Sequence, residues 1–190
     1  MKRAIVTSRT LTNQWGEDFA SVSQNLIQYL AWVGYSSISL SKHSAGDLPK
    51  FISSFQPDLI VLSGGESIGE DLARDSFEYG LLDLIQTTDT PTLGICRGMQ
   101  IIGSFVGQSP TPLKNHSGTK HLVGGLISAE VNSFHNFGFE SVTMPLVPLI
   151  TAHDGTIEAF KHDKLPWLGV MWHPERDTPE NWHNVLRFIL

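Results

Sequence analysis

The chain contains a single cysteine, Cys96, in the sequence GICRGMQ (94–100), directly after an apolar run. Glycines on both sides permit a sharp strand-to-helix turn that lifts a side chain out of a sheet, as in a nucleophile elbow. The positive end of the following helix would stabilise a thiolate, and the backbone N–H of Arg97 would point toward a developing oxyanion. A free cysteine is also commonly a buried apolar side chain. The turn alone therefore leaves a nucleophile and a core residue equally open.

A nucleophilic thiol needs a base, and GVMWHPE (169–175) supplies one at the end of another apolar run. Residues two apart in an extended chain project to the same side. The Glu175 carboxylate can therefore hold one imidazole nitrogen of His173 while the other nitrogen serves the thiol. A lone histidine is more often structural, but a His-x-Glu after an elbow cysteine is much more specific for catalysis.

A second oxyanion donor could come from Gly64 and Gly65, which follow the apolar run at 59–62. Glycines expose backbone N–H groups and let a substrate come close. The alternative interpretation is an ordinary glycine turn.

Alternating strands and helices must position these residues. Short apolar runs predict strands at 4–7, 36–40, 59–62 and 92–95, and helical apolar spacing predicts helices at 19–33, 77–85 and 98–106. This alternation predicts an α/β fold with a doubly wound, mostly parallel central sheet flanked by helices. Reactive groups gather at the carboxyl ends of the strands in such sheets.

The second half of the chain predicts a small additional β element. Residues 110–125 are rich in Pro, Gly, Lys and His, which predicts a loop or lid. We further expect strands at 126–131, 141–144, 157–160 and 168–171, and a C-terminal helix at 179–187. No repeat or linker divides the chain, so we expect one domain over residues 1–190.

Composition narrows the function classes. The formal net charge of −6 disfavours nonspecific binding to nucleic acid or to an anionic membrane. No run approaches the roughly 18 apolar residues of a membrane span, and the N-terminal apolar run is too short for a signal peptide. One cysteine cannot form an internal disulfide. We expect a cytoplasmic protein without a cofactor.

Five motifs together resemble the class I glutamine amidotransferase superfamily, the Cys-His-Glu enzymes that attack γ-glutamyl amides. They are LSGG (62–65), GICRGMQ, VNSFHN (131–136), DGTIEAF (154–160) and GVMWHPE. The resemblance implies a flavodoxin-like fold with Cys96 as nucleophile, His173 as base and Glu175 as its orienter. It also implies that the backbone N–H groups of Gly65 and Arg97 form the oxyanion hole. The residues it places around the glutamyl moiety of a small-molecule substrate are Gly64, Gln100, Asn132, Ser133 and Phe134.

Within this superfamily, CRGMQ, VNSFHN and TIEAF are more similar to the γ-glutamyl hydrolase branch. The compact length and NHSGTKH (115–121) resemble the family of γ-glutamyl-CDP-amidate hydrolases of capsule phosphoramidate synthesis. That resemblance implies hydrolysis through a glutamyl thioester, which releases glutamate and cytidine diphosphoramidate. Two alternatives stay open: a glutaminase subunit that delivers ammonia to a partner synthetase, and a γ-glutamyl-aminobutyrate-type hydrolase. A binding protein that has lost catalysis is disfavoured by the intact triad.

Basic side chains gather in the predicted lid, and they are Lys114, His116, Lys120 and His121. They could contact a pyrophosphate group of the substrate, and the alternative is a solvated basic loop. We expect no metal site, because no acidic or cysteine ligand stands near the two histidines. We expect the Arg97 side chain to brace the elbow through a buried carboxylate, and we assign His135 no proton-transfer role.

Overall fold

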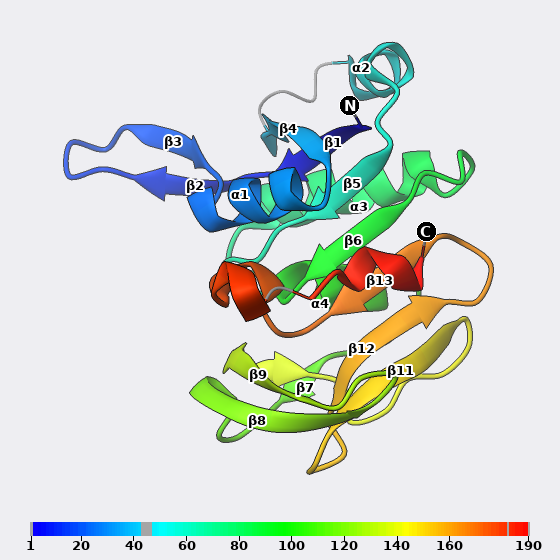
Figure 1. Ribbon diagram of the computed structural model, residues 1–190. Helices are drawn as coiled ribbons and strands as arrows, with labels where there is room; N and C mark the ends of the chain where they lie inside the picture. Colours follow the sequence, from blue (N-terminus) through cyan, green and yellow to red (C-terminus); the bar gives the residue numbers. More distant parts are fainter. Residues whose placement is uncertain (1, 43–46, 182, 190) are drawn as a thin grey trace.

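The computed structural model describes residues 2–42, 47–181 and 183–189, and a nine-stranded sheet runs through this part of the chain (Figure 1). Its parallel strands are, in spatial order, β4 (Tyr35–Leu40), β1 (Lys2–Thr7), β5 (Leu59–Leu62), β6 (Thr92–Ile95) and β13 (Trp167–Val170). The antiparallel strands that continue it are β12 (Ile157–His162), β11 (Leu146–Ala152), β8 (Ser117–Gly125) and β9 (Ala129–Phe134). The predicted α/β fold is confirmed, and the additional β element is an extension of the same sheet.

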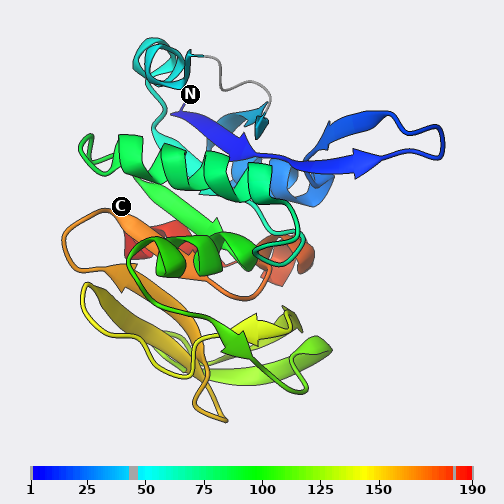
Figure 2. The same cartoon turned by 180° about the vertical axis from the view of Figure 1, so that it is seen from behind.

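Helices cover both faces of the parallel strands, which explains why β5, β6 and β13 are buried along their whole length. On one face lies α1 (Gln24–Trp32), which packs in one apolar cluster with the 3₁₀ turn η4 (Val185–Phe188). On the other face lie α3 (Leu72–Ile85) and α4 (Arg97–Phe105), seen in front in Figure 2. The sheet therefore separates two apolar cores.

The N-terminal third differs from the expectation in two elements. The helix predicted at 19–33 begins only at Gln24, and a hairpin of β2 (Arg9–Thr12) and β3 (Asp18–Ser21) precedes it. The Asn13 side chain accepts hydrogen bonds from the backbone N–H groups of Trp15 and Glu17, which closes the hairpin turn. A helix α2 (Leu48–Phe55) was not predicted, although Asp47 caps it by accepting from the Lys50 N–H.

The prediction of a loop or lid at 110–125 is wrong, because residues 117–125 form β8 and pair with β9. The strand predicted at 141–144 is also wrong, since the next strand of the sheet is β11, which begins at Leu146. The short strands β7 (Thr111–Pro112) and β10 (Phe137–Gly138) pair with each other. Pairing with other strands decides that these segments are strands, and local composition does not report that pairing.

The predicted C-terminal helix is replaced by separate 3₁₀ turns among the described residues: η2 (Pro174–Arg176), η3 (Pro179–Asn181) and η4. The Tyr29 hydroxyl of α1 donates to the His183 carbonyl at 2.7 Å. This tertiary contact uses a carbonyl group that a continuous helix would need for its own ladder. None of the described helices is long and apolar enough to cross a membrane.

Candidate active site

Cys96 stands between the end of β6 and the first residue of α4. Its backbone has φ 51° and ψ −105°, a left-handed conformation that a non-glycine residue rarely adopts. The backbone N–H of Cys96 donates to the Val170 carbonyl at 2.8 Å, which ties the elbow to the end of β13. Strain of this kind persists only where the surrounding structure holds it, and it clusters at functional sites.

The two glycines near Cys96 are required by close packing. A Cβ atom on Gly98 would lie 2.0 Å from the Leu62 carbonyl oxygen of β5. A Cβ atom on Gly94 would lie 2.5 Å from the Gly98 carbonyl carbon. The first turn of α4 can therefore rest directly on the strands only because both positions lack side chains.

His173 and Glu175 share one side of the chain after β13, as their spacing predicts. His173 Nδ1 lies 2.7 Å from Glu175 Oε1, and both side chains are buried. Burial alone would lower the pKa of His173, but hydrogen bonds with Cys96 and Glu175 raise it to about 9. Because a carboxylate only accepts, the proton on Nδ1 faces Glu175 and Nε2 is left for the thiol.

Asn132 clamps the main chain of His173. Its side-chain oxygen accepts from the His173 N–H at 3.0 Å, and its side-chain nitrogen donates to the His173 carbonyl at 2.8 Å. Both ends of the amide are thus engaged by the residue that carries the imidazole. In this structure the Asn132 side chain holds the main chain of His173 in place, and its predicted contact with a glutamyl group stays a prediction.

The Gly64–Gly65 segment lies against the thiol and the imidazole. A Cβ atom on Gly64 would lie 2.8 Å from His173 Cε1 and 3.8 Å from Cys96 Cβ. A Cβ atom on Gly65 would lie 2.4 Å from an Arg74 guanidinium nitrogen. The absence of a side chain therefore lets the backbone of this segment lie against Cys96, His173 and Arg74, and its oxyanion role stays a prediction.

A buried charge network holds this segment and the elbow together. Arg97 donates to Glu78 and Asp75 of α3, which confirms the expectation that its side chain braces the elbow. Arg74 donates to Glu78 at 3.1 Å and to the Ser63 carbonyl at 2.9 Å. Arg74 was missed from the sequence, where its spacing to Glu78 resembles that of an exposed helical ion pair.

Gln100 and Ser133 make protein contacts from positions near the elbow. Gln100 Nε2 donates to the Phe137 carbonyl at 2.9 Å, and the Ser133 hydroxyl donates to the His116 carbonyl. Both side chains are buried. Their predicted contacts with a glutamyl group stay predictions.

Phe134 is 45% exposed, although it follows directly after buried residues of β9. Its ring centroid lies 6.1 Å from that of His173, and the Arg176 guanidinium stands 4.7 Å from it. An exposed aromatic ring beside the imidazole offers a wall for a substrate.

A cavity of about 210 Å³ has His173, Glu175 and the Gly64–Gly65 segment among its lining residues. Two arginines, Arg9 and Arg176, also line it. Neither was singled out in the sequence, because they lie far apart in the chain and outside any motif that implies binding.

The basic residues of the predicted lid do not form one group. Lys114 and Lys120 are exposed, and Lys120 lies 3.8 Å from the Glu130 carboxylate. His116 and His121 are buried and face Glu158. We therefore correct the expectation of a common anion contact, because both histidines are buried against Glu158 while Lys120, next to His121 in β8, lies on the opposite face of the strand.

The expectation that no acidic ligand stands near these histidines is also wrong. Glu158 Oε1 lies 3.2 Å from His121 Nε2 and 3.8 Å from His116 Nδ1. The carboxylate comes from β12, which lies in the same sheet as β8 with β11 between them.

Fold and site together define an α/β protein with a cysteine–histidine–glutamate constellation at the carboxyl ends of parallel strands. The family model for "Glutamine amidotransferase class-I" matches residues 17–189. The chain therefore belongs to the class I glutamine amidotransferase family.

Known relatives carry several functions. The chain is 35% identical over 134 residues to a gamma-glutamyl-CDP-amidate hydrolase from Campylobacter jejuni, covering 67% of each protein. It is 26% identical to anthranilate synthase component 2 of Azospirillum brasilense, covering 92% of each. A solved structure of a glutamine amidotransferase from Thermotoga maritima superposes with a TM-score of 0.69 at 19% identity, covering 92% of this chain and 76% of that one. That last likeness supports the fold alone.

Proposed function

We propose that the protein is a cysteine hydrolase that cleaves a γ-glutamyl amide through a glutamyl thioester. The observation that carries this proposal is the arrangement of Cys96 on a strained elbow, with His173 beside it at the Gly64 backbone and Glu175 2.7 Å behind the imidazole. A thiol, a base and an oriented carboxylate in this order are the parts that nucleophilic acyl transfer needs.

In the first half-reaction His173 already holds the second imidazole proton on Nε2, in keeping with its raised pKa, and Cys96 Sγ attacks the γ-carbonyl carbon. The oxyanion accepts hydrogen bonds from the backbone N–H groups of Arg97 and Gly65. Arg97 is the first residue of α4, where an N–H group has no acceptor within the helix. His173 then gives its proton to the leaving nitrogen, the C–N bond breaks, and the thioester forms.

In the second half-reaction water must lose a proton to a neutral imidazole. Hydrogen bonding with Cys96 contributes to the raised pKa of His173. Acylation removes that contribution, because a thioester sulfur carries no charge and no proton. The pKa of His173 then falls, and His173 becomes the base that activates the water. Glutamate leaves and the thiol is restored.

For the leaving group, we propose the cytidine diphosphoramidate of γ-glutamyl-CDP-amidate. The name of the Campylobacter jejuni relative supports this choice. Arg9 and Arg176 line the cavity beside His173 and Glu175, and guanidinium groups suit bidentate contacts with phosphate oxygens. These arginines replace the lid residues as the expected anion contacts.

A second candidate function is that of a glutaminase subunit. The hairpin of β2 and β3 carries exposed apolar side chains, with Trp15 80% exposed at its turn. Arg9 and Ser21 of this hairpin line the cavity, so the exposed apolar surface adjoins the site. Such a surface suits a partner that receives ammonia, and the likeness to anthranilate synthase component 2 agrees with it.

The deciding experiment is glutamate release by the purified chain from L-glutamine, γ-glutamyl-CDP-amidate and γ-glutamyl-aminobutyrate. We expect rapid release from the CDP-amidate, little from glutamine, and none from any substrate with the Cys96→Ala variant. Replacing Arg9 and Arg176 by Gln should raise KM for the CDP-amidate and leave glutamine turnover unchanged. Silence on all three substrates, with Cys96 still alkylated by a glutamine-like electrophile, would refute the hydrolase and favour the glutaminase subunit.

A further inference from the structure

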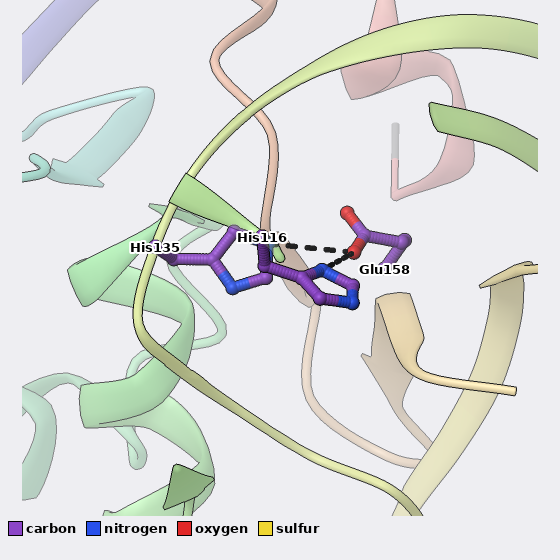
Figure 3. A group of neighbouring side chains, drawn as sticks. All are labelled: His116, His135 and Glu158. Atoms are coloured by element: carbon purple, nitrogen blue, oxygen red, sulfur yellow. Dashed lines mark ion pairs between the residues drawn. The ribbon is translucent and has the colours of Figure 1, made fainter. Parts of the chain in front are cut away.

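A cluster of buried histidines lies in the antiparallel part of the sheet, outside the catalytic triad. His116 precedes β8, His121 lies within β8, and His135 follows β9. They converge on Glu158 of β12, and Figure 3 shows His116 and His135 directed toward its carboxylate. All four side chains are buried, with Glu158 fully enclosed.

The atoms that point into this cluster have no hydrogen-bond partner. They are His116 Nδ1, His121 Nε2, His135 Nε2 and both carboxylate oxygens of Glu158. The three nitrogens lie 3.8, 3.2 and 3.5 Å from Glu158 Oε1, respectively. Buried polar atoms are rarely left unpaired, because each costs about 1–3 kcal/mol. Five unpaired polar atoms around one point indicate a ligand that would contact them together.

The hydrogen bonds of the outward-facing ring nitrogens of His116 and His135 determine which nitrogen of each ring carries the proton. His116 Nε2 lies 2.8 Å from Asp154 Oδ2, and His135 Nδ1 lies 3.1 Å from the Phe137 carbonyl. Both partners are acceptors, so the outward nitrogens carry the protons and the inward nitrogens of neutral rings present lone pairs. A histidine with a carboxylate or carbonyl behind it is the usual outer-shell arrangement of a metal ligand.

We propose that this cluster binds one divalent transition-metal ion, with Zn²⁺ as the probe. The ligands are His116 Nδ1, His135 Nε2 and a Glu158 oxygen, which lie within 4.8 Å of one another. His121 Nε2, 3.2 Å from Glu158 Oε1, supplies the fourth position after a small shift. Tetrahedral zinc with bonds of about 2.0–2.2 Å keeps its ligand atoms roughly 3.3 Å apart, close to the observed spacings. Imidazole and carboxylate ligands suit zinc.

Four protein ligands leave no open position, so the ion is structural. Its ligands adjoin the catalytic site through hydrogen bonds. The Ser133 hydroxyl and the His135 N–H both donate to the His116 carbonyl. The Glu158 carbonyl accepts from the Met171 N–H at 2.8 Å, two residues before His173. The metal therefore pins the end of β9 and the chain that carries the base onto one point of β12.

The test is metal content in a Cys96→Ser background, which prevents zinc from binding at the catalytic thiol. Protein produced with zinc supplied, then gel-filtered, should contain one zinc per chain by mass spectrometry. After chelation, added Zn²⁺ at 100 times Kd should raise the midpoint of thermal unfolding by roughly 5–10 °C. Co²⁺ should give the absorption of a tetrahedral site without a sulfur ligand.

Glu158→Gln and His135→Gln should lose the metal, whereas His153→Gln, an exposed histidine next to Asp154, should keep it. Asp154→Asn, a milder change, should bind zinc about 10–100-fold more weakly. Absence of stoichiometric zinc in the Cys96→Ser protein, together with an unchanged unfolding midpoint on adding zinc, would overturn the proposal. It would mean that protonated histidines neutralise Glu158.

Discussion

Glu78 offers the sharpest test of how the elbow is held. Glu78→Gln keeps the shape of the side chain but replaces the carboxylate that joins two arginines. Glu78 accepts from Arg97 through one oxygen and from Arg74, at 3.1 Å, through the other. Glu78 and Arg74 are fully enclosed, and Arg97 is almost so. The amide would bring an N–H group against a buried guanidinium and leave that cation short of an acceptor.

The size of the effect follows from this burial. Removing one partner from a buried ion pair costs about 3–5 kcal/mol, because the remaining charge stays away from water. For a protein of this size, each kcal/mol lowers the unfolding midpoint by roughly 2–4 °C, so we expect a fall of roughly 6–20 °C. The matched control is Glu130→Gln, which breaks the exposed pair with Lys120. It should cost less than about 1 kcal/mol.

Urea unfolding of both variants measures the two free energies, with an unchanged slope as the sign that only stability moved. Glutamate release by Glu78→Gln should also fall, since Arg74 and Arg97 fix the Ser63 carbonyl and the elbow relative to each other. Equal losses of stability in Glu78→Gln and Glu130→Gln would refute the view that the buried network holds the site.

Three further outcomes are expected. Glu175→Gln should lower the turnover number less than His173→Ala does, because Glu175→Gln weakens the orientation of the base but leaves the base in place. A larger loss in Glu175→Gln would mean that the roles of the two residues are misassigned. Gly98→Ala should destabilise the fold by about 1–3 kcal/mol, because its Cβ would meet a β5 carbonyl at 2.0 Å. Gly80→Ala, on α3 with open space around it, should instead be neutral or stabilise by roughly 0.5–1 kcal/mol, and chemical denaturation compares the two. Burial lowers the pKa of His173, but hydrogen bonds with Cys96 and Glu175 raise it from 6.5 to about 9. The stability that this raised pKa contributes is complete below pH 6.5 and is lost as the pH rises through about 9. The free energy of unfolding should therefore fall between pH 6.5 and about 9 in the parent protein, and it should fall by less in His173→Ala.

The sequence by itself determined the parallel half of the sheet and the constellation at its edge. The strands at β5, β6 and β13 are short apolar runs that need cover on both faces, and that pattern is local. The elbow at Cys96 and the spacing of His173 to Glu175 are also local, because turn glycines and the alternation of an extended chain set them. Their positions in the structure agree with that prediction.

Tertiary structure alone decided which side chains surround the Cys96 elbow and the pair of His173 and Glu175. Pairing with β9 makes β8 a strand, although its composition is that of a loop, and pairing carries no local signal. The carboxylates that hold Arg97 and the arginines beside His173 come from other elements of the fold. Glu158 meets the histidines of the lid region only because β12 lies in the same sheet as β8. Burial turns the carboxylates around Arg97 and the histidines around Glu158 into a brace and a candidate metal site, because an enclosed charge must find its partner inside the protein.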